Sequence, residues 1–452
     1  MNTEKETFFI ETFGCQMNVN DSEKVAGLLE AEGYRPAPSA DSADFVFLNT
    51  CAVREKAADK LYHSLGRLRK LRARRPGLVI GVGGCVAQLE GKAVIERSPQ
   101  VDILVGTHNL ARVPEFLRQK RDGGQLLVDL NRKADSFAVP AAAVAHGSSV
   151  RAYVTAMEGC NHVCSFCVVP RTRGPEVCRS PEEIVAEVEL LVARGYPEVM
   201  LLGQTVNAYR VADCGFADLL RRVHGVRGLV RLRFTTSHPE HVTVAMADAF
   251  RDLPKLCPYL HLPVQSGSEG VLASMRRGYG AAEYREKVAL LRDRVPGLAL
   301  STDFIVGYPG ESEEDFQDSL DLLEDPGIGF EGIFAFTYSP RPGTTAVRLA
   351  DDVPEDEKRR RLKILNHRQQ AAQARRNASK VASLETVLVD EISGGGRLSG
   401  RTPHFRIVHF DGDSALLGHL VEVEITGAGA NSLTGRIPPS GSLTGSSAAP
   451  IL

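Results

Sequence analysis

No stretch of this sequence of 452 residues is long and apolar enough to cross a membrane. The nearest candidate, 185–202, is interrupted by four charged residues, which are Glu187, Glu189, Arg194 and Glu198. The N-terminal residues also lack a basic segment followed by an apolar run, the pattern of a secretory signal peptide. These two absences argue against the membrane and secretory classes, and we expect a cytosolic protein with no membrane partner.

The sequence also lacks an excess of charge of either sign. It contains 54 Lys and Arg residues against 56 Asp and Glu residues, for a formal net charge of −2. A general basic field that would attract nucleic acid is therefore absent, and any contact with RNA must depend on local clusters. The contents of hydrophobic residues, 43%, and of charged residues, 24%, are typical of globular proteins, and the length allows two or three domains.

Cysteine is present nine times, an odd number, in a sequence without a recognisable export signal. A disulfide framework is not expected under these conditions, and metal binding or redox chemistry is the better hypothesis. Three of the cysteines follow short apolar runs near the N-terminus: Cys15 follows 8–10, Cys51 follows 44–50 and Cys85 follows 78–84.

Helical patterns over 21–32 and 54–74 separate these apolar runs, which predicts a parallel sheet built from alternating strands and helices. Ligands of such sheets lie beyond the carboxyl ends of the strands. Because each cysteine occupies that end of its strand, we expect Cys15, Cys51 and Cys85 to converge on one site. Taken singly, each could also be a small buried apolar residue.

The chain divides into further segments after an N-terminal domain over 6–125. Ala, Ser and Pro are frequent in a predicted linker over 126–148. Alternating strands and helices over 149–378 indicate an open relative of the parallel barrel, with strands at 151–157, 198–202, 229–235, 259–263, 298–306 and 332–338. Short β-like runs after a charged helix predict a small barrel of the OB type over 379–440, and the Ser-, Gly- and Pro-rich tail over 441–452 is expected to be disordered.

The clearest chemical signal is the loop Cys160-Asn161-His162-Val163-Cys164-Ser165-Phe166-Cys167, directly after the first strand of the second region. Thiolates bind iron–sulfur clusters and zinc, and both normally take four ligands. Three thiolates on a four-iron cluster leave one iron open to a small molecule. A zinc site is the alternative, and it would need a fourth ligand such as His162 or Cys178.

This loop resembles the radical S-adenosylmethionine (SAM) superfamily, whose hallmark is CxxxCxxC after the first barrel strand. The resemblance implies a [4Fe-4S] cluster on Cys160, Cys164 and Cys167, with the amino and carboxylate groups of SAM on the open iron. Cleavage of SAM by the reduced cluster then gives a 5′-deoxyadenosyl radical. Phe166 would pack beside this cluster.

Further motifs resemble the methylthiotransferases of that superfamily, and within them the tRNA adenosine (MiaB-type) branch. Motifs spread over nearly the whole chain carry the resemblance: 12–18, 49–54, 83–88, 168–174, 201–204, 237–239, 261–268, 302–311 and 338–344. The segments 263–268 and 339–344 favour the tRNA branch over the branch that modifies a ribosomal protein. One position departs from the pattern, because Cys178 stands where a serine is expected.

The resemblance also implies a fold and a reaction. The N-terminal domain would be a flavodoxin-like parallel α/β domain, the centre a partial (βα)6 radical SAM barrel, and the C-terminal barrel a TRAM domain that binds RNA. Cys15, Cys51 and Cys85 would hold a second [4Fe-4S] cluster that carries a sulfide. One SAM would methylate this sulfur, and a second SAM would supply the radical that activates C2 of N6-isopentenyladenosine in tRNA.

Polar residues near the ends of the barrel strands are candidates for contact with SAM or the substrate, although such residues often only cap loops. The candidates are Glu176, Arg179, Gly203, Gln204, Asn207, Ser237, Gln265 and Asp303.

Contact with the anticodon stem-loop of tRNA is expected from local basic clusters. Two of them lie on predicted helices, at 67–75 and 358–376, and each could also be a solvated helix face. A third lies on the C-terminal barrel and consists of Arg401, His404, Phe405 and Arg406. The resemblance further implies a reduced flavodoxin-like or other electron donor and a source of sulfide, and a monomer is the simplest expectation.

Two related reactions stay open from the sequence: methylthiolation of N6-threonylcarbamoyladenosine in tRNA, and modification of an aspartate in a ribosomal protein. A non-catalytic iron–sulfur carrier is the alternative from another class, and it leaves both the partial barrel and the RNA module unexplained.

Overall fold

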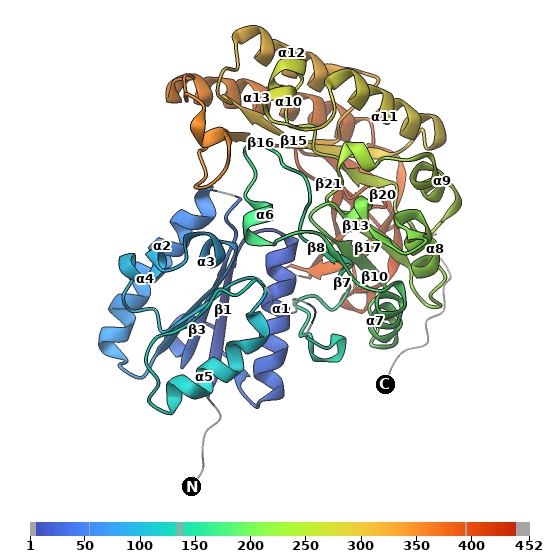
Figure 1. The fold of residues 1–452 in the computed structure, drawn as a ribbon. Helices are drawn as coiled ribbons and strands as arrows, with labels where there is room; N and C mark the ends of the chain where they lie inside the picture. The colour runs from blue at the N-terminus through green and yellow to red at the C-terminus, as the bar shows by residue number, and fades with distance from the viewer. Residues whose placement is uncertain (1–5, 54, 133–136, 138, 394–395, 440–452) are drawn as a thin grey trace.

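The computed structural model describes residues 6–53, 55–132, 137, 139–393 and 396–439, and its three parts are an N-terminal α/β sheet, a central open barrel and a C-terminal closed barrel (Figure 1). The tail predicted over 441–452 lies outside the described residues. No helix within the described ranges combines the length and the apolar character that a membrane span requires.

The N-terminal sheet has the strand order β2-β1-β3-β4-β5-β6, and all its pairs are parallel. This is the order of flavodoxin-like folds, extended by one strand. The central strands β3 (Phe45–Thr50) and β4 (Val79–Gly84) are buried at every residue, as their apolar runs predict for strands covered on both faces. The other strands are β1 (Thr7–Phe13), β2 (Arg35–Pro36), β5 (Ile103–Val105) and β6 (Leu127–Asp129).

Helices cover both faces of this sheet. One face packs against α2 (Glu55–Arg74), α3 (Cys85–Glu90) and α4 (Ala93–Arg97), and the other against α1 (Gln16–Ala31) and α5 (Val113–Arg121). Because β6 pairs with β5, the sheet extends to Asp129, beyond the end predicted for this domain at residue 125. The first residues of the predicted linker are therefore part of the sheet.

The central region has six main strands, as predicted, in two parallel sheets with the orders β13-β10-β7 and β14-β15-β16. Backbone hydrogen bonds join the two sheets, from Cys257 N to Leu232 O (3.0 Å) and from Ser237 N to His261 O (3.2 Å). The six strands therefore form one open, partial barrel. Their bounds are β7 (Arg151–Thr155), β10 (Glu198–Leu202), β13 (Arg231–Thr235), β14 (Tyr259–His261), β15 (Ala299–Val306) and β16 (Gly332–Thr337).

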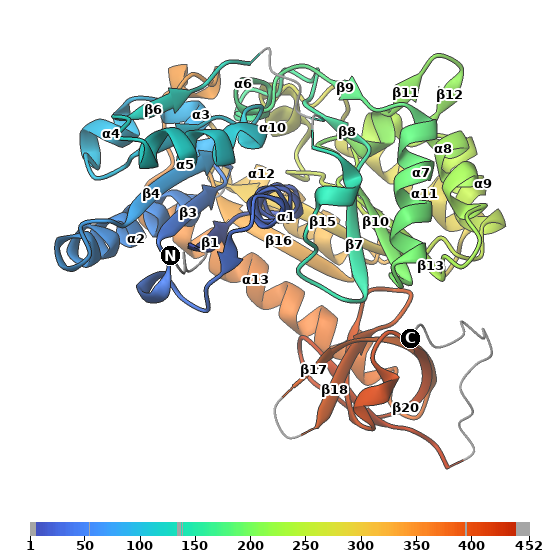
Figure 2. The same cartoon turned by 90° about the horizontal axis from the view of Figure 1, so that it is seen from below.

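Helices and short strands connect these six strands. The helices are α6 (Val169–Thr172), α7 (Pro181–Ala193), α8 (Phe216–His224), α9 (Val244–Asp252), α10 (Glu269–Ser274), α11 (Ala281–Arg294) and α12 (Glu313–Glu324). The short strands are β8 (Met157–Glu158), β9 (Val177–Cys178), β11 (Arg210–Val211) and β12 (Cys214–Gly215). The N-terminal helix α1 lies between the N-terminal sheet and β7, which places the carboxyl ends of both sheets near each other (Figure 2).

The long helix α13 (Glu355–Ala378) leads to a closed barrel with the strand order β17-β18-β19-β21-β20. Apolar side chains from all five strands fill its interior. The barrel lies beside β7, β10 and β13 and away from the N-terminal sheet (Figure 2). Its strands are β17 (Leu384–Ile392), β18 (Arg397–Arg401), β19 (Ile407–Asp411), β20 (Leu420–Ala428) and β21 (Leu433–Arg436).

Candidate functional site

The three N-terminal cysteines follow adjacent strands of the sheet. Cys15 is the residue before α1 and comes after β1, Cys51 directly follows β3, and Cys85 begins α3 after β4. Cys15 and Cys51 therefore flank the point between β1 and β3 where flavodoxin-like sheets bind their ligands. The structure brings the three thiols together, because Cys51 hydrogen-bonds Cys15 and the charges of Cys15 and Cys85 both act on it.

These thiols have different affinities for their protons. The hydrogen bond from Cys51, together with the amides of Asn18 and Met17 and the charge of Arg173, lowers the pKa of Cys15 to about 6. The same hydrogen bond and burial raise the pKa of Cys51 well above its usual value, and burial raises the pKa of Cys85. Metal ligation needs thiolates, and Cys15 is the thiol of this set whose charged form the surroundings favour.

The second cysteine set lies on the loop that follows β8. Cys160, Cys164 and Cys167 act electrostatically on one another, as expected for three neighbouring thiols. The guanidinium of Arg277 donates a hydrogen bond to Cys164 Sγ (3.3 Å), and the amide of Val169 donates one to Cys167 Sγ (3.4 Å). Burial raises the pKa of Cys167 to about 12.

Neither cysteine set resembles a site for a single zinc ion. Within the part of the chain that the structure describes, only a group of three histidines and one glutamate brings its ligand atoms all within 4.8 Å of one another. A four-iron cluster is larger than one ion and holds its thiolates further apart. Three thiolates that are not gathered around one point, with no fourth ligand beside them among the described residues, therefore fit an iron–sulfur cluster with one open iron better than a four-coordinate zinc ion.

Two contacts anchor the loop between its cysteines. The hydroxyl of Ser165 lies 2.8 Å from the Tyr308 hydroxyl and donates to the Ser274 carbonyl (3.0 Å). Phe166 packs against an apolar cluster that contains Met275, Tyr308 and Tyr338. The backbone of the loop is thus fixed by residues that lie more than 100 positions further along the chain.

Arg173 lies between the two cysteine sets and has a role that the sequence did not reveal. Its side chain is almost fully buried, and its guanidinium faces Asp21 on α1 (3.4 Å from Nη1 to Oδ1) and Glu158 on β8 (3.7 Å). Its positive charge also acts on Cys15 and Cys85. The residue appears only as an Arg-Gly pair in the sequence, where nothing signals that its charge would be buried.

Two of the residues predicted to contact SAM or substrate have features expected of a binding site. The Ser237 hydroxyl is buried and has no hydrogen-bond partner among the described residues. Gln265 adopts a φ of +82°, which is uncommon for a residue with a side chain and is found preferentially where function fixes the backbone. Both follow strands at the open end of the barrel.

Other predicted residues form contacts within the protein. Gln204 accepts a hydrogen bond from the Gly159 amide, and Asn207 exchanges two hydrogen bonds with the backbone of His238 (2.9 and 2.8 Å). Gly203 is packed so closely that a Cβ would lie 2.7 Å from Met157. These contacts hold the strand ends in place around the cysteine loop.

Glu176 and Arg179 also have partners in the structure. Glu176 accepts hydrogen bonds from Asn161 (3.1 Å) inside the cysteine loop and from the Thr205 hydroxyl (3.1 Å). Arg179 donates to the Thr155 carbonyl (3.0 Å) and pairs with Glu187. Cys178, the residue that departs from the family pattern, pairs with Met157 between β8 and β9.

One inner face of the barrel carries exposed aromatic side chains. Asp303 on β15 lies opposite Phe334 on β16 in the parallel register, and the His261 ring lies 3.5 Å from the Asp303 carboxylate and edge-on to Phe334. Phe334 and Phe336, two residues apart on β16, are 50% and 37% exposed. Exposed aromatic rings at the inner face of a barrel are suited to stacking against a base.

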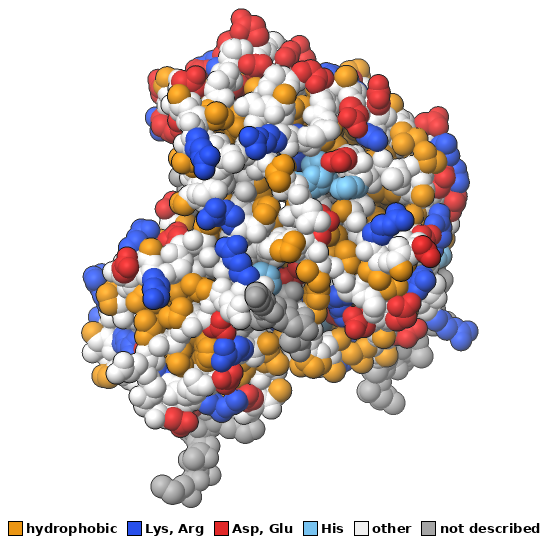
Figure 3. Space-filling model, in the orientation of Figure 1, with side chains coloured by type: hydrophobic (Ala, Val, Ile, Leu, Met, Phe, Trp, Pro, Cys, Tyr) orange, Lys and Arg blue, Asp and Glu red, His pale blue; other side chains and the backbone are white. Residues whose placement is uncertain are grey.

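The predicted basic clusters divide into paired and exposed side chains. Arg72 on α2 and Arg75 directly after it pair with Asp102 and Asp44, whereas Arg69, Lys70 and Arg74 of α2 are exposed. On α13, Lys358, Arg360, Arg361 and Arg368 form ion pairs with acidic residues. Lys and Arg side chains also surround the notch between the N-terminal domain and the central region (Figure 3).

Of the barrel residues predicted to contact RNA, Arg401, Phe405 and Arg406 make contacts within the protein, and His404 is partly buried beside them. The Phe405 ring stacks on Tyr259 of the central region (4.9 Å between centroids), and Arg401 and Arg406 pair with Asp390 and Glu331. The mixture of charged and aromatic residues at this point of the barrel serves the contact with the central region instead.

Models of three protein families match this chain. They are the uncharacterized protein family UPF0004 over residues 7–106, the radical SAM superfamily over residues 154–323 and the TRAM domain over residues 378–437. These three matches coincide with the N-terminal sheet, the open barrel and the closed barrel.

Two relatives match over almost their whole length. A protein of Methylococcus capsulatus is 47% identical over 444 residues, which is 96% of this chain and 95% of that protein. One of Geobacter sulfurreducens is 46% identical over 443 residues, which is 96% of this chain and 98% of that protein. Both are named tRNA-2-methylthio-N(6)-dimethylallyladenosine synthase.

Solved structures share the fold at low sequence identity. The radical SAM methyltransferase TsrM from Kitasatospora setae has a TM-score of 0.55 at 13% identity, over 76% of this chain and 74% of that chain. The cobalamin-dependent SAM radical enzyme OxsB has a TM-score of 0.52 at 12% identity, over 82% of this chain and 56% of that chain. These likenesses describe the fold alone.

Proposed function

This chain belongs to the family of MiaB-type tRNA methylthiotransferases, which are radical SAM enzymes, and on that premise we propose that it attaches a methylthio group to C2 of N6-isopentenyladenosine beside the tRNA anticodon. The observation that carries the proposal is the pair of separate cysteine triads at the carboxyl ends of two parallel sheets, with Arg173 between them.

The chemistry of the substrate explains the need for two sites. The C2–H bond of adenine is neither acidic nor polarised, so acid–base catalysis cannot break it. Cys160, Cys164 and Cys167 would hold a [4Fe-4S] cluster that, with SAM, would supply a carbon radical, and Cys15, Cys51 and Cys85 would hold a second cluster that would supply the sulfur for methylation by another SAM. The protein contributes by placing the radical source and the sulfur source around one base.

The chain's own residues have three tasks in this scheme. Arg277 and the Val169 amide donate hydrogen bonds to the thiolates of the loop, which stabilises their negative charge. Ser237, Gln265 and Asp303 line the open end of the barrel, where SAM would lie, and Phe166 packs beside the cluster. We propose that Phe334 and Phe336 stack against the adenine or its isopentenyl group.

Partners follow from the same scheme. Electrons would come from a reduced flavodoxin-like protein or another donor, and sulfide must be renewed after each turnover. The TRAM-like barrel and the exposed Arg69, Lys70 and Arg74 of α2 are the proposed contacts with the anticodon stem-loop, and one chain is sufficient for both cysteine triads.

The test is anaerobic incubation of the reconstituted, reduced protein with SAM and tRNA that carries isopentenyladenosine, followed by mass spectrometry of the digested nucleosides. We expect the 2-methylthio nucleoside, with 5′-deoxyadenosine and S-adenosylhomocysteine. Cys15→Ala should abolish the product yet keep the cleavage of SAM. The matched control is Cys257→Ala, which removes a buried cysteine outside both triads and should leave all three products in place.

Other outcomes point elsewhere. Cleavage of SAM without a modified base would keep the radical enzyme and redirect the search to threonylcarbamoyladenosine or a ribosomal protein. A protein that binds iron and sulfide but never cleaves SAM would instead be a carrier. Phe334→Ala separates base recognition from radical formation: product should fall about 10- to 100-fold, in line with the loss of one stacking contact, while uncoupled cleavage of SAM persists.

A further inference from the structure

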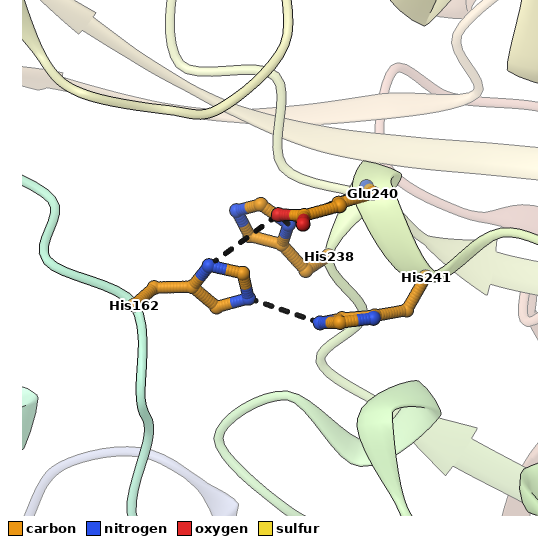
Figure 4. Close-up of side chains that lie close together, drawn as sticks. All are labelled: His162, His238, Glu240 and His241. Carbon is orange, nitrogen blue, oxygen red and sulfur yellow. Dashed lines mark hydrogen bonds and ion pairs between the residues drawn. The ribbon is translucent and has the colours of Figure 1, made fainter.

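Three histidines and a glutamate meet beside the cysteine loop (Figure 4). His162 lies within the loop, between Cys160 and Cys164. His238, Glu240 and His241 come from the turn that follows β13, and their side chains point toward His162. One ligand atom from each of the four residues can be chosen so that all lie within 4.8 Å of one another.

The distances between these side chains are close to those of a metal site. His162 Nε2 lies 3.0 Å from His241 Nε2, and the Glu240 carboxylate lies 3.6 Å from His162 Nδ1 and 4.0 Å from His238 Nδ1. Two nitrogen ligands of one zinc ion, each bound at about 2.0–2.1 Å in a tetrahedron, lie about 3.3 Å apart. An ion could therefore be accommodated among them once the His162 ring turns out of its stack on His238, because a metal binds in the plane of each imidazole.

The His238 imidazole is in the form that binds metal. Burial, with the charge of Arg277 and of the neighbouring histidines, lowers the pKa of His238 far below its usual value. The His238 residue is 3% exposed, and its Nε2 has no hydrogen-bond partner among the described residues. Neutral imidazole is a common metal ligand, and a buried, unpaired ring nitrogen is costly without one.

The surrounding structure holds this arrangement in place. The Asn207 side chain makes two hydrogen bonds with the His238 backbone, which fix the turn. The His162 and His238 rings stack with 3.9 Å between their centroids, which keeps the loop and the turn side by side, and an ion would replace this stacking contact. Arg277 brings a positive charge near the group, but its guanidinium donates to Cys164 Sγ, and Glu240 adds a negative charge on the side of the histidines.

We propose that His162, His238, Glu240 and His241 form a binding site for one divalent transition-metal ion, with zinc as the preferred occupant. Three imidazoles and one carboxylate match the donor types and the ligand number of zinc. The ion would join the cysteine loop to the turn after β13. It would therefore restrain the position of the loop through His162, in addition to the restraint that the thiolates provide. This site is separate from the proposed methylthiotransferase reaction, and either can fail without the other.

The test uses the anaerobic holoenzyme with its iron content determined. The protein is equilibrated with zinc chloride, separated from free zinc and measured by elemental analysis and by X-ray absorption at the zinc edge. We expect one zinc ion per chain in addition to the iron, with nitrogen and oxygen neighbours at about 2.0–2.1 Å and no thiolate neighbours at about 2.3 Å.

Variants assign the site to its residues. Glu240→Gln and His241→Gln should each weaken zinc binding at least about tenfold, a loss no smaller than that caused by removal of a metal site's outer hydrogen-bond partners. The Glu240 side chain is 49% exposed, so Glu240→Gln should fold normally, which its circular dichroism and iron content would verify. The control is His367→Gln on the exposed face of α13, which should bind zinc like the unaltered protein.

Three results would overturn the proposal: no zinc on the holoenzyme, zinc with sulfur neighbours, or equal binding by the unaltered protein and both variants. The second result would place the zinc on the cysteine triads. If His241→Gln failed to fold, the comparison between Glu240→Gln and His367→Gln would still decide the question.

Discussion

Gly159 sets the direction in which the chain enters the cysteine loop of the central barrel. Its φ is +81°, and a Cβ at this position would lie 1.9 Å from the carbonyl oxygen of Pro175. Its amide donates to Gln204, and Cys160 is the next residue. Glycine is thus required here for two reasons, the left-handed backbone and the close approach of another backbone segment.

A pair of alanine substitutions separates these two reasons. Gly310 has the same φ of +81° but nothing within 4 Å of its Cβ position, so Gly310→Ala should cost only the about 1–2 kcal/mol of a left-handed alanine. Gly159→Ala must also displace the Pro175 backbone. We expect it to lose the iron of one cluster and all cleavage of SAM, while Gly310→Ala keeps both. Equal iron contents in the two variants would contradict this account.

The buried guanidinium of Arg173 neutralises two buried carboxylates, those of Asp21 and Glu158. Replacing one partner of a buried ion pair costs about 3–5 kcal/mol, because the remaining charge stays buried without compensation. We therefore expect Arg173→Met to lower the free energy of unfolding by that amount, measured by urea denaturation of the apoprotein. The double variant Asp21→Asn with Arg173→Met should recover part of the loss. A double variant less stable than Arg173→Met would show that the buried charge of Asp21 is not what destabilises Arg173→Met.

Strands β7, β10 and β13 are joined at their amino ends by one buried carboxylate. Glu198 pairs with Arg151 on β7 and Arg233 on β13 (2.8 Å), and the same arginines continue to the closed barrel, at Asp390 (3.1 Å) and at the carbonyls of Thr402 and Pro403 (2.8 and 2.9 Å). Although burial alone would raise its pKa, the charges of Arg233 and Arg151 lower the pKa of Glu198 to about 2.

This shift predicts a pH dependence. Because the pKa of Glu198 falls from about 4.5 unfolded to about 2 folded, its contribution of about 3 kcal/mol is fully present above pH 4.5 and is lost as pH falls toward 2. Glu198→Gln lacks this contribution, so its stability deficit should shrink between pH 5 and pH 3. Urea denaturation at several pH values measures the deficit. A deficit that stayed constant over this interval would mean that Glu198 is not ionised in the native protein.

Elements and chemistry were predictable from the sequence to different degrees. The six barrel strands lie where the sequence predicted them, because a strand buried on both faces needs an apolar run such as 199–202 of β10, which is buried at every residue. The cysteine positions at strand ends were predictable for the same reason. The ion-pair network of Glu198 and Arg233 was not, because nothing local marks a charged residue as buried when its partners lie on other strands and on another domain.

The contact between the closed barrel and the central region could not be predicted from the sequence either. The existence of the barrel followed from short β-like runs, but the surface it presents to the central region did not. Phe405, at a φ of +70°, stacks on Tyr259, and the guanidinium groups of Arg151, Arg233 and Arg401 lie 5.5, 4.9 and 5.1 Å from its ring centroid. A motif that suits RNA and a motif that suits a cation–π contact have the same composition.

The position of the barrel leads to a prediction about the whole enzyme. If the C-terminal closed barrel binds tRNA while it is docked on the central region, it holds the anticodon loop at a fixed distance from the cysteine loop. The local concentration of the substrate base at the cysteine loop is then high. Phe405→Ala should loosen this docking. Its cost in stability should stay below the about 3–5 kcal/mol of a fully buried phenylalanine, because the ring is only partly buried.

Loosened docking should therefore raise KM for tRNA more than it lowers kcat, since the chemical site is unchanged and only the delivery of the base is affected. Steady-state kinetics with increasing tRNA, together with hydrogen exchange over the chain between α13 and β17, measures both effects. The matched control is Leu384→Ala, which truncates a side chain that is 58% exposed on the same barrel and should change neither. A fall in kcat at constant KM would show instead that Phe405 acts on the reaction through Tyr259 and the strands behind it, and that docking of the barrel has no part in delivering tRNA.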